Sequence, residues 1–377
     1  MQKNFNFKKI IFIIDNLEFG GGERCFVQLI SGLHNQFEIF AAGTPGGEFE
    51  KEVKKSGAYF FPVDMRKQKS LNSIIKIRKI ILKHKIDIIH SQGVRADFFA
   101  RAAGFSAGTK NIICTTAMPV EGFDVSFLRK KIYRFFDWIL EDSVKRFIVV
   151  SQSLKKLLTE KRHIPEYKVI KIYNGIELEH YIPKKNNQSI ETSYNVPIIG
   201  AIGRMVWQKG FEYLIKAIPK IVKHIPEAEF LFVGDGPLLP SLKKLSIQLN
   251  LSDKIIFTGF SNDVKEVLSK IDILVVPSLL EGFPMITLEA MAMAKPVVAS
   301  DIDGINEQIT NGKDGILVSP KNPGAIADAV IALIRNKETA KQIGIAARKK
   351  VEQDFSVEKM ILETENVYFS MLKNELS

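Results

Sequence analysis

Two carboxylates in one short segment form the most specific chemical pattern in this chain. Glu281 and Glu289 flank the residues GFPMITL, at the start of a predicted helix. Pro284 suits the first turn of that helix, because its missing N–H would have no partner there. We expect the helix to run from about Pro284 to Lys295 and to stop before Pro296.

The turn before this helix has the composition of an anion site. Gly282 lets the backbone approach a ligand, and the N–H groups at a helix N-terminus favour negative charge. We expect a phosphate there, beside Phe283, Pro284, Met285 and Ile286. Carboxylates do not bind phosphate but accept hydrogen bonds from hydroxyls. The segment therefore fits a nucleotide diphosphate sugar, although a capping glutamate followed by an exposed one is the alternative interpretation.

A pair of cations, Arg204 and Lys209, lies in the segment GRMVWQKG. The segment follows the apolar run PIIGAIG, which predicts a strand, so both cations lie in the loop beyond its end. Arginine presents a planar fork of donors and lysine a point charge, so the two can converge on one anion. Two solvated surface cations are the alternative.

Glycine-rich turns follow two other predicted strands. Gly21 and Gly22, in NLEFGGGER, let backbone N–H groups approach a phosphate, although a tight turn explains them equally well. The spacing is not GxGxxG, which argues against an NAD-dependent oxidoreductase. Gly234 begins the turn GDGP in the second half. Asp301 and Asp303 form a DxD, but two aspartates after a strand are usually loop residues, so we expect no metal site.

The composition is that of a soluble protein with a basic first half. The 377 residues suit two domains, and no apolar run approaches the roughly 20 residues that span a bilayer. Residues 1–180 carry 30 basic against 19 acidic residues, a net charge of +11, whereas residues 181–377 carry 23 of each. A basic surface favours anionic partners, namely nucleic acid, anionic lipid or a phosphate-bearing substrate, although solubility alone explains the charge equally well. Only Cys25 and Cys114 are present, so we expect a reducing cytoplasm and no disulfide framework.

Short apolar, β-branched runs alternate with helical patterns throughout. They are KIIFIID, FEIFAAG, AYFFPV, IDIIHS, NIICTT, RFIVVS and KVIKIY, then PIIGAIG, AEFLFVG, KIIFTGF, DILVVPS, PVVASD and GILVS. Runs without strict alternation suit strands buried on both faces, in parallel sheets covered by helices. We predict two doubly wound, Rossmann-like α/β domains, at residues 1–180 and 190–355, with a polar linker at about 179–196 and the active site in the cleft between them.

In these motifs the chain resembles the retaining GT-B glycosyltransferases of glycosyltransferase family 4, or glycosyl transferases group 1. The resemblance covers nearly the whole chain, and its most specific part is GRxxxxKG, GDGP and the glutamate pair, in the family's order. It implies that Glu281 contacts the donor sugar, Glu289 the nucleotide ribose, and Arg204 and Lys209 the diphosphate. It also implies that a terminal helix, at about 357–377, packs back on the first domain.

Weaker matches concern the first domain. Asn174, in IYNGIE, resembles the motif at the end of that domain, and His90 resembles the first histidine of the family's HxH-like strand end. Ala117 and Met118 stand where family members often place a histidine, so whether this domain supplies one to the donor sugar is left open. Glu307, in GINEQI, can face the cleft, although a helix-surface glutamate is the commoner interpretation.

The resemblance implies a retaining, metal-independent transfer of a sugar from a UDP- or GDP-sugar to a glycan or polyprenyl-diphosphate-linked acceptor in cell-surface polysaccharide synthesis. Gly21, Gly22 and Gly234 would join the donor site, the first domain would receive the acceptor, and no cofactor is needed. A GT-B-fold nucleotide-sugar epimerase and a non-catalytic nucleotide-sugar binding protein are the alternatives. We expect no nucleic-acid partner.

Peripheral contact with an anionic membrane, on the inner face of the plasma membrane, is compatible with the basic first half. The segment LRKKIYRFFDWIL, residues 128–140, has apolar and basic residues at helical spacing that suit such contact. A core helix flanked by surface cations is the favoured interpretation of that segment.

Overall fold

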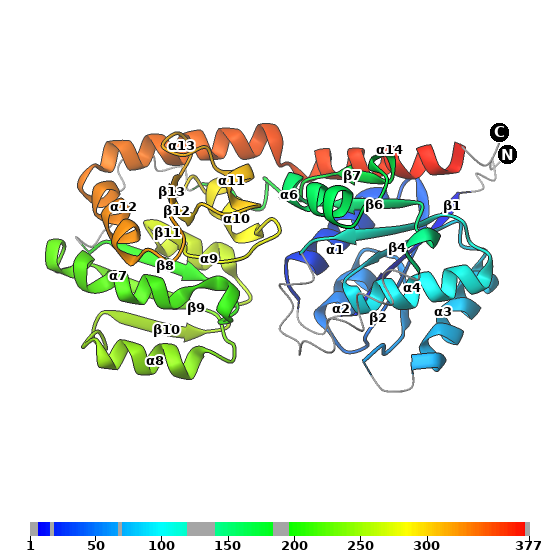
Figure 1. The fold of residues 1–377 in the computed structure, drawn as a ribbon, viewed down its shortest axis with the longest axis horizontal. Helices are drawn as coiled ribbons and strands as arrows, with labels where there is room; N and C mark the ends of the chain where they lie inside the picture. The colour runs from blue at the N-terminus through cyan, green and yellow to red at the C-terminus, as the bar shows by residue number, and fades with distance from the viewer. Residues whose placement is uncertain (1–6, 16–18, 67–69, 119–139, 184–195, 374–377) are drawn as a thin grey trace. The chain divides into compact units, whose positions relative to one another are not determined.

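A computed structural model of the chain describes residues 7–15, 19–66, 70–118, 140–183 and 196–373. The chain divides into two compact units, each built on one parallel sheet (Figure 1). Unit 1 comprises Met1–Gly175 and Val357–Ser377, and unit 2 comprises Ile176–Ser356. The architecture is the two-sheet α/β fold that the apolar runs predicted.

Unit 1 has a seven-stranded sheet with the order β3-β2-β1-β4-β5-β6-β7, in which all neighbours are parallel. Its strands are β1 (Lys8–Ile14), β2 (Phe37–Gly43), β3 (Tyr59–Pro62), β4 (Ile88–Gln92), β5 (Ile112–Thr116), β6 (Arg146–Val149) and β7 (Val169–Lys171). Its helices are α1 (Gly21–Leu33), α2 (Glu48–Lys55), α3 (Ser70–His84), α4 (Val94–Ala107), α6 (Gln152–Lys156) and α14 (Val357–Lys373). Short helical turns are η2 (Glu141–Ser143), η3 (Leu157–Lys161) and η4 (Glu166–Lys168). Each apolar run of the first half contains one of these strands.

Helix α14 completes unit 1 although it lies at the far end of the sequence. It packs against α1, where a Cβ on Gly32 would lie only 2.3 Å from Cδ1 of Ile361. The Tyr368 side chain is fully buried and contacts His90 of β4. The absence of a side chain at position 32 therefore leaves room for Ile361 between the two helices.

Unit 2 has a six-stranded parallel sheet with the order β10-β9-β8-β11-β12-β13. Its strands are β8 (Ile198–Ile202), β9 (Glu229–Val233), β10 (Ile255–Gly259), β11 (Ile273–Val276), β12 (Val297–Ser300) and β13 (Ile316–Val318). Its helices are α7 (Phe211–His224), α8 (Leu239–Gln248), α9 (Val264–Lys270), α10 (Met285–Ala292), α11 (Ile305–Gln308), α12 (Pro323–Arg335) and α13 (Lys337–Asp354). The turn η5 (Trp207–Lys209) precedes α7.

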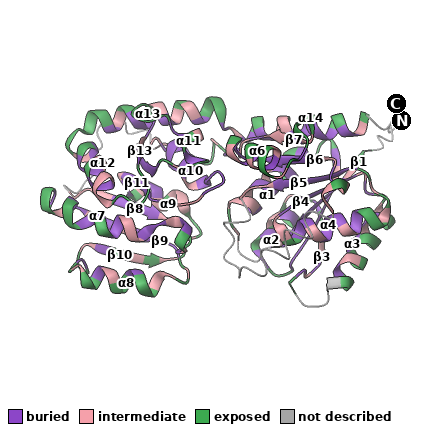
Figure 2. Ribbon diagram, in the orientation of Figure 1, coloured by how far each residue is buried: buried purple, intermediate pink, exposed green. Residues whose placement is uncertain are grey.

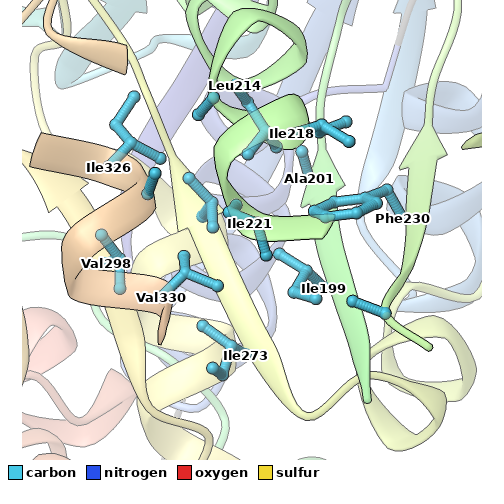
Figure 3. Packing of buried hydrophobic residues seen from close by; sticks show 14 of the residues in the cluster. Ile199, Ala201, Leu214, Ile218, Ile221, Phe230, Ile273, Val298, Ile326 and Val330 are labelled. Carbon is cyan, nitrogen blue, oxygen red and sulfur yellow. The ribbon is translucent and has the colours of Figure 1, made fainter. Parts of the chain in front are cut away.

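The core of unit 2 lies between its sheet and the helices α7 and α12. Ile218 and Ile221 of α7 pack with Val330 of α12 over Ile199 and Ile273 of the sheet (Figure 3). The central strands are buried on both faces in each unit (Figure 2), which explains their continuous apolar runs.

The predicted helix over 284–295 is shorter at both ends. Helix α10 runs Met285–Ala292, and Pro284 is its extended N-cap rather than part of its first turn (φ −69°, ψ 127°). Ala294 adopts a left-handed conformation (φ 54°), and the backbone N of Lys295 donates to the O of Ala290 at 2.9 Å. This left-handed turn caps the C-terminal end before the proline is reached.

The chain enters and leaves unit 2 at neighbouring points. Ile176 forms a parallel bridge with Ser356, and its N donates to the O of Phe355 at 2.9 Å. Residues 184–195 of the expected linker, and residues 128–139 of the expected amphipathic segment, lie outside the described residues. Among the described residues, no helix combines the length and apolar character needed to cross a bilayer.

Candidate functional site

The strand order of unit 2 changes direction between β8 and β11, which are adjacent and parallel. Ligands of doubly wound sheets bind at this point, beyond the carboxyl ends of the strands. The loop after β8 carries Arg204 and Lys209, and the loop after β11 carries Glu281. The sequence-predicted residues therefore gather where the topology favours a ligand.

Glycine allows these two loops to touch. Gly210 has a positive φ of 60°, and a Cβ there would lie 2.1 Å from the O of Pro277. Close by, the backbone N of Leu279 donates to the O of Gln208 at 2.6 Å. A side chain at position 210 would force the loops apart, so this contact fixes the position of Lys209 relative to Glu281.

Lys209 and Glu281 form the charged centre of this site. The Nζ of Lys209 lies 2.7 Å from Oε1 of Glu281, and the Oγ of Ser278 donates to the same oxygen at 2.7 Å. The Glu281 side chain is 4% exposed and the Lys209 side chain 23% exposed. Among the described residues, none donates a hydrogen bond to Oε2 of Glu281. The carboxylate is thus held through one oxygen, and the ammonium group keeps access to solvent.

The loop after β8 also packs on the turn after β9. A Cβ on Gly234 would lie 1.9 Å from the O of Gly203, and the N of Met205 donates to the O of Asp235 at 2.8 Å. Arg204 lies in this loop with its side chain exposed. The structure brings Lys209 and Glu281 into contact and leaves Arg204 on the exposed side of the same loop.

The start of α10 is fixed by α11 and the glycine before it. A Cβ on Gly304 would lie 2.3 Å from the O of Gly282, and the buried Gln308 donates from Nε2 to the O of Pro284 at 3.0 Å. The first N–H groups of a helix have no partner within it and are suited to an anion. Glu307, on α11, is partly buried.

The beginning of α10 is buried almost entirely. Phe283 is 4% exposed, and its ring packs edge-on against Phe355 at 5.4 Å between centroids. Met285 is also buried, whereas Ile286 is partly exposed. A ligand at this helix start would therefore meet an environment from which much water is excluded.

Glu289 lies one helical turn into α10 and is 3% exposed. The phenol of Tyr181 donates to its Oε1 at 3.0 Å. Arg348 of α13 donates from Nη1 to the O of Tyr181 at 2.5 Å and to the O of Ala292 at 2.7 Å. The segment that carries Tyr181 is thus tied to the C-terminal end of α10.

In unit 1 the corresponding change of direction lies between β1 and β4. Gly22, at the start of α1, leaves room for Gln92 at the end of β4, because a Cβ there would lie 2.3 Å from Nε2 of Gln92. The carboxylate of Glu23 accepts from the N of Gly20 at 2.9 Å and so caps α1. Gly21 is the first residue of that helix.

Asp15 follows β1 and is buried beside the same edge. Its carboxylate accepts from Oγ1 of Thr44 at 3.1 Å and from Nη1 of Arg95 at 2.7 Å. Burial raises the pKa of Asp15 above its usual value, although Arg95 and Thr44 act in the opposite direction. None of these three residues belongs to a motif in the sequence.

His90 is fully buried in β4. Its Nδ1 lies 2.5 Å from the hydroxyl of Tyr368, and its Nε2 lies 2.7 Å from Oγ1 of Thr115. Burial lowers the pKa of His90 to about 3, so the ring is neutral at physiological pH. His90 and Asn174 both line a cavity of about 20 Å³, which is room for about one water molecule.

Two residues of the unit 2 site, Ser278 and Tyr181, were not predicted from the sequence. Ser278 lies two positions after the end of β11 and three before Glu281, so its place beside a loop glutamate was the available signal. Tyr181 lies 108 positions from Glu289 and carries no motif. Among the described residues, no three His, Cys, Asp or Glu side chains are grouped so that they could hold a metal ion.

Comparison with known proteins assigns both halves of the chain. The family profile "Glycosyl transferases group 1" matches residues 184–350, and "Glycosyltransferase Family 4" matches residues 19–180. The UDP-Gal:alpha-D-GlcNAc-diphosphoundecaprenol alpha-1,3-galactosyltransferase of Escherichia coli is 26% identical, over 94% of this chain and 95% of its own. The capsular polysaccharide biosynthesis glycosyltransferase CapM of Staphylococcus aureus is 25% identical, over 89% and 90%.

Solved structures share the fold. A glycosyltransferase from Rickettsia africae aligns with a TM-score of 0.81 at 26% identity, covering 98% of this chain and 100% of its own. Anabaena HepE, solved in complex with UDP and glucose, aligns with a TM-score of 0.84 at 19% identity, covering 96% and 100%. Together with the two sheets and the order of the motifs, these matches show that the chain is a GT-B protein of the glycosyltransferase family 4 (glycosyl transferases group 1) family.

Proposed function

We propose that this protein transfers a sugar from a nucleotide diphosphate sugar, a UDP- or GDP-sugar, to a glycan or lipid-linked glycan acceptor, with retention at the anomeric carbon. The contact of Lys209 with Glu281 at the switch point of unit 2 carries the proposal, because it sets a cation and a carboxylate side by side at the expected ligand position. The cation can donate hydrogen bonds to phosphate oxygens, and the carboxylate can accept a hydrogen bond from a sugar hydroxyl.

Unit 2 would bind the donor. Lys209 and Arg204, with the start of α10, would offset the charge that grows on the diphosphate as the glycosidic bond breaks. Glu281 would accept a hydrogen bond from a hydroxyl of the sugar through Oε2. Glu289 would accept one from the ribose. We infer that no metal is required, because protein cations supply the charge.

Unit 1 would receive the acceptor. Residues 1–180 carry the whole net charge of the chain, +11, which suits an acceptor with phosphate groups. The E. coli relative is named for a diphosphoundecaprenol acceptor and the S. aureus relative for capsular polysaccharide. Synthesis of a cell-surface polysaccharide in the cytoplasm, from an acceptor at the inner face of the membrane, is the role that we propose.

A thermal-shift panel tests the donor class. Wild-type protein is melted with UDP, GDP, ADP, their sugar conjugates and NAD, because a ligand that binds only the folded state raises Tm. We expect a rise with one nucleotide diphosphate, and a smaller rise in Glu289→Gln and Lys209→Gln. Lys216→Gln is the matched control, since Lys216 pairs with Glu212 on the outer side of α7. A rise with NAD alone would contradict the proposal.

Product analysis tests the reaction. The donor that raises Tm is incubated with and without candidate acceptors, with and without EDTA, and the anomeric signals of the product are read by NMR. A new α- or β-linkage that matches the donor's configuration, formed equally in EDTA, is the expected result. An epimerised donor without acceptor would identify an epimerase, and binding without turnover on any acceptor would identify a binding protein.

A further inference from the structure

Helix α3 of unit 1 exposes three large apolar side chains to solvent. Leu71 is 72% exposed, Ile75 48% and Leu82 47%. At about 100° per residue these three lie within an arc of about 40° on the helix. Ile77 and Ile81, which are buried in unit 1, lie on a different side. Figure 2 shows the exposed side of α3 on the surface of unit 1. The helix thus has a second apolar strip in addition to the one that builds the core.

The same helix carries cations and no acidic residue. Lys76, Arg78, Lys79 and Lys83 are all exposed. None of the three lysines forms an ion pair with any residue that the structure describes. Helix α2 differs, because each of its three lysines pairs with a glutamate three or four positions away. The charge of α3 is therefore available to an external anion.

The end of α4 adjoins α3 and carries a further exposed apolar residue. Nε of Arg78 donates to the O of Ser106 at 3.1 Å, which holds the last turn of α4 against α3. The neighbouring Phe105 is 72% exposed. An exposed phenylalanine beside a basic helix has the composition of a surface that meets a lipid interface.

We propose that this surface docks on an anionic phospholipid bilayer. The surface, called the α3 face below, consists of Leu71, Ile75, Lys76, Arg78, Lys79, Leu82, Lys83 and Phe105. The apolar strip enters the boundary between headgroups and acyl chains, while the cations contact anionic headgroups. The inference goes beyond transfer itself, and rests on the proposed function only in that a lipid-linked acceptor would explain why the protein docks.

Other occupants fit the α3 face less well. A second copy related by a two-fold axis would place this basic surface against itself, which like charges oppose. Nucleic acid would account for the lysines but would leave Leu71, Ile75 and Leu82 without an apolar partner. A bilayer with anionic lipid provides an apolar environment for the leucine and isoleucine side chains and anionic headgroups for the cations.

Vesicle flotation tests the proposal without need of catalysis. The full chain is mixed with phosphatidylcholine vesicles or with vesicles of phosphatidylcholine and phosphatidylglycerol, and floated at low and at high salt. We expect co-flotation with the phosphatidylglycerol vesicles, weakened by salt because the cations are exposed. Absence of flotation with phosphatidylglycerol at low salt would overturn the proposal.

A matched pair of charge variants locates the surface. Lys79→Gln with Lys83→Gln should lower the partition coefficient about thirty-fold, since each cation near an anionic membrane contributes about a factor of five. Lys243→Gln with Lys244→Gln removes the same charge from the exposed side of α8 in unit 2 and should leave partitioning within about two-fold. Equal losses in the two variants would show attraction by net charge alone and overturn the assignment to α3.

An apolar pair tests insertion. Leu71→Gln with Leu82→Gln should weaken binding by about a hundred-fold, and Ile247→Gln, at a residue that is 64% exposed on α8, should not change it. Unchanged binding by the α3 variant would overturn the insertion of that strip. A dimer in light scattering that Leu82→Gln dissociates, without vesicle binding, would assign the face to a second copy instead.

The α3 variants also separate this inference from the proposed function. They lie outside the donor-binding residues, so turnover of the donor on a water-soluble acceptor and the Tm rise with nucleotide should match wild type. Retained turnover without flotation refutes the membrane surface and leaves the transferase intact. Flotation without nucleotide binding would support the membrane surface and refute the proposed transferase function.

Discussion

The Nζ of Lys209 lies 2.7 Å from Oε1 of Glu281, although 72 positions separate the two residues in sequence. Ser278 donates to the same oxygen. The pair joins the loop after β8 to the loop after β11, at the switch point of the unit 2 sheet. Under the proposed function, the contact would orient the lysine toward a phosphate and leave the second carboxylate oxygen for a hydroxyl.

Replacing Lys209 with glutamine should lower kcat/KM for the donor by about 10- to 100-fold, because a hydrogen bond to a charged group contributes about 1.5–3 kcal/mol. The free energy of unfolding should also fall, by about 2 kcal/mol, since the buried Glu281 carboxylate loses its cation. Steady-state kinetics and urea denaturation measure the two effects. Lys216→Gln, on the same unit, is the control, and equal losses in both variants would contradict the assignment.

Tyr181→Phe should raise KM for the donor about tenfold and leave kcat nearly unchanged, because Glu289 loses the phenol that fixes its carboxylate. If Tyr181 acts through Glu289, adding this substitution to Glu289→Gln should cause little further loss. Isothermal titration gives the nucleotide affinity of the wild type, the two single variants and the double variant, which together form a double-mutant cycle. Tyr167→Phe, at an exposed tyrosine, is the control, and fully additive effects would show that Tyr181 acts independently.

Gly210→Ala should separate the two loops of the site. The new Cβ would lie 2.1 Å from the O of Pro277, so the backbone must move, at a cost of about 3 kcal/mol or more. Gly312→Ala is the matched control: its φ is also positive, 76°, but a Cβ there meets no atom within 4 Å, so only about 1–2 kcal/mol of backbone strain is expected. Thermal melts and nucleotide titrations compare the two, and equal behaviour would refute the role of loop contact.

His90 should make the stability of the protein sensitive to acid. Its pKa is about 3 in the folded protein against 6.5 for the free side chain, so the unfolded state binds a proton first as the pH falls. Above about pH 6.5 the ring is neutral in both states, so His90 does not make the free energy of unfolding depend on pH. Between pH 6.5 and pH 3 the free energy of unfolding falls by up to about 1.4 kcal/mol per pH unit as the pH is lowered. His90→Asn should show a shallower loss of Tm between pH 6.5 and 4.

The exposed His224 provides the comparison for this pH effect. His224→Asn should keep the wild-type slope of Tm against pH, since that ring lies on the surface of α7. Carboxylates contribute equally to both variants, so only the difference in slope reports on His90. Identical slopes in the two variants would refute a buried, neutral His90.

Local sequence determined the strands, the fold class and the loops that hold the candidate site. Continuous apolar runs such as IDIIHS and DILVVPS predicted strands buried on both faces, because a strand that is covered on both faces needs apolar side chains at successive positions. The segment GRxxxxKG and the glutamate pair, through their residue types and their resemblance to the family's motifs, predicted Arg204, Lys209, Glu281 and Glu289 as site residues. The helix end before Pro296 was predicted too late, because the left-handed Ala294 gives no local signal.

Tertiary structure alone decided the partners of those residues. Tyr181 reaches Glu289 across 108 positions, and His90 reaches Tyr368 of α14 across 278. Such contacts depend on which strands become neighbours and on which helix covers them, and no local periodicity encodes either. His90, at a strand end, had the sequence context of a site residue, whereas the fold surrounds it with Tyr368 and Thr115 in the core of unit 1. The sequence determines the chemical type of each side chain, but the packing of elements that are distant in sequence determines its burial and its partners.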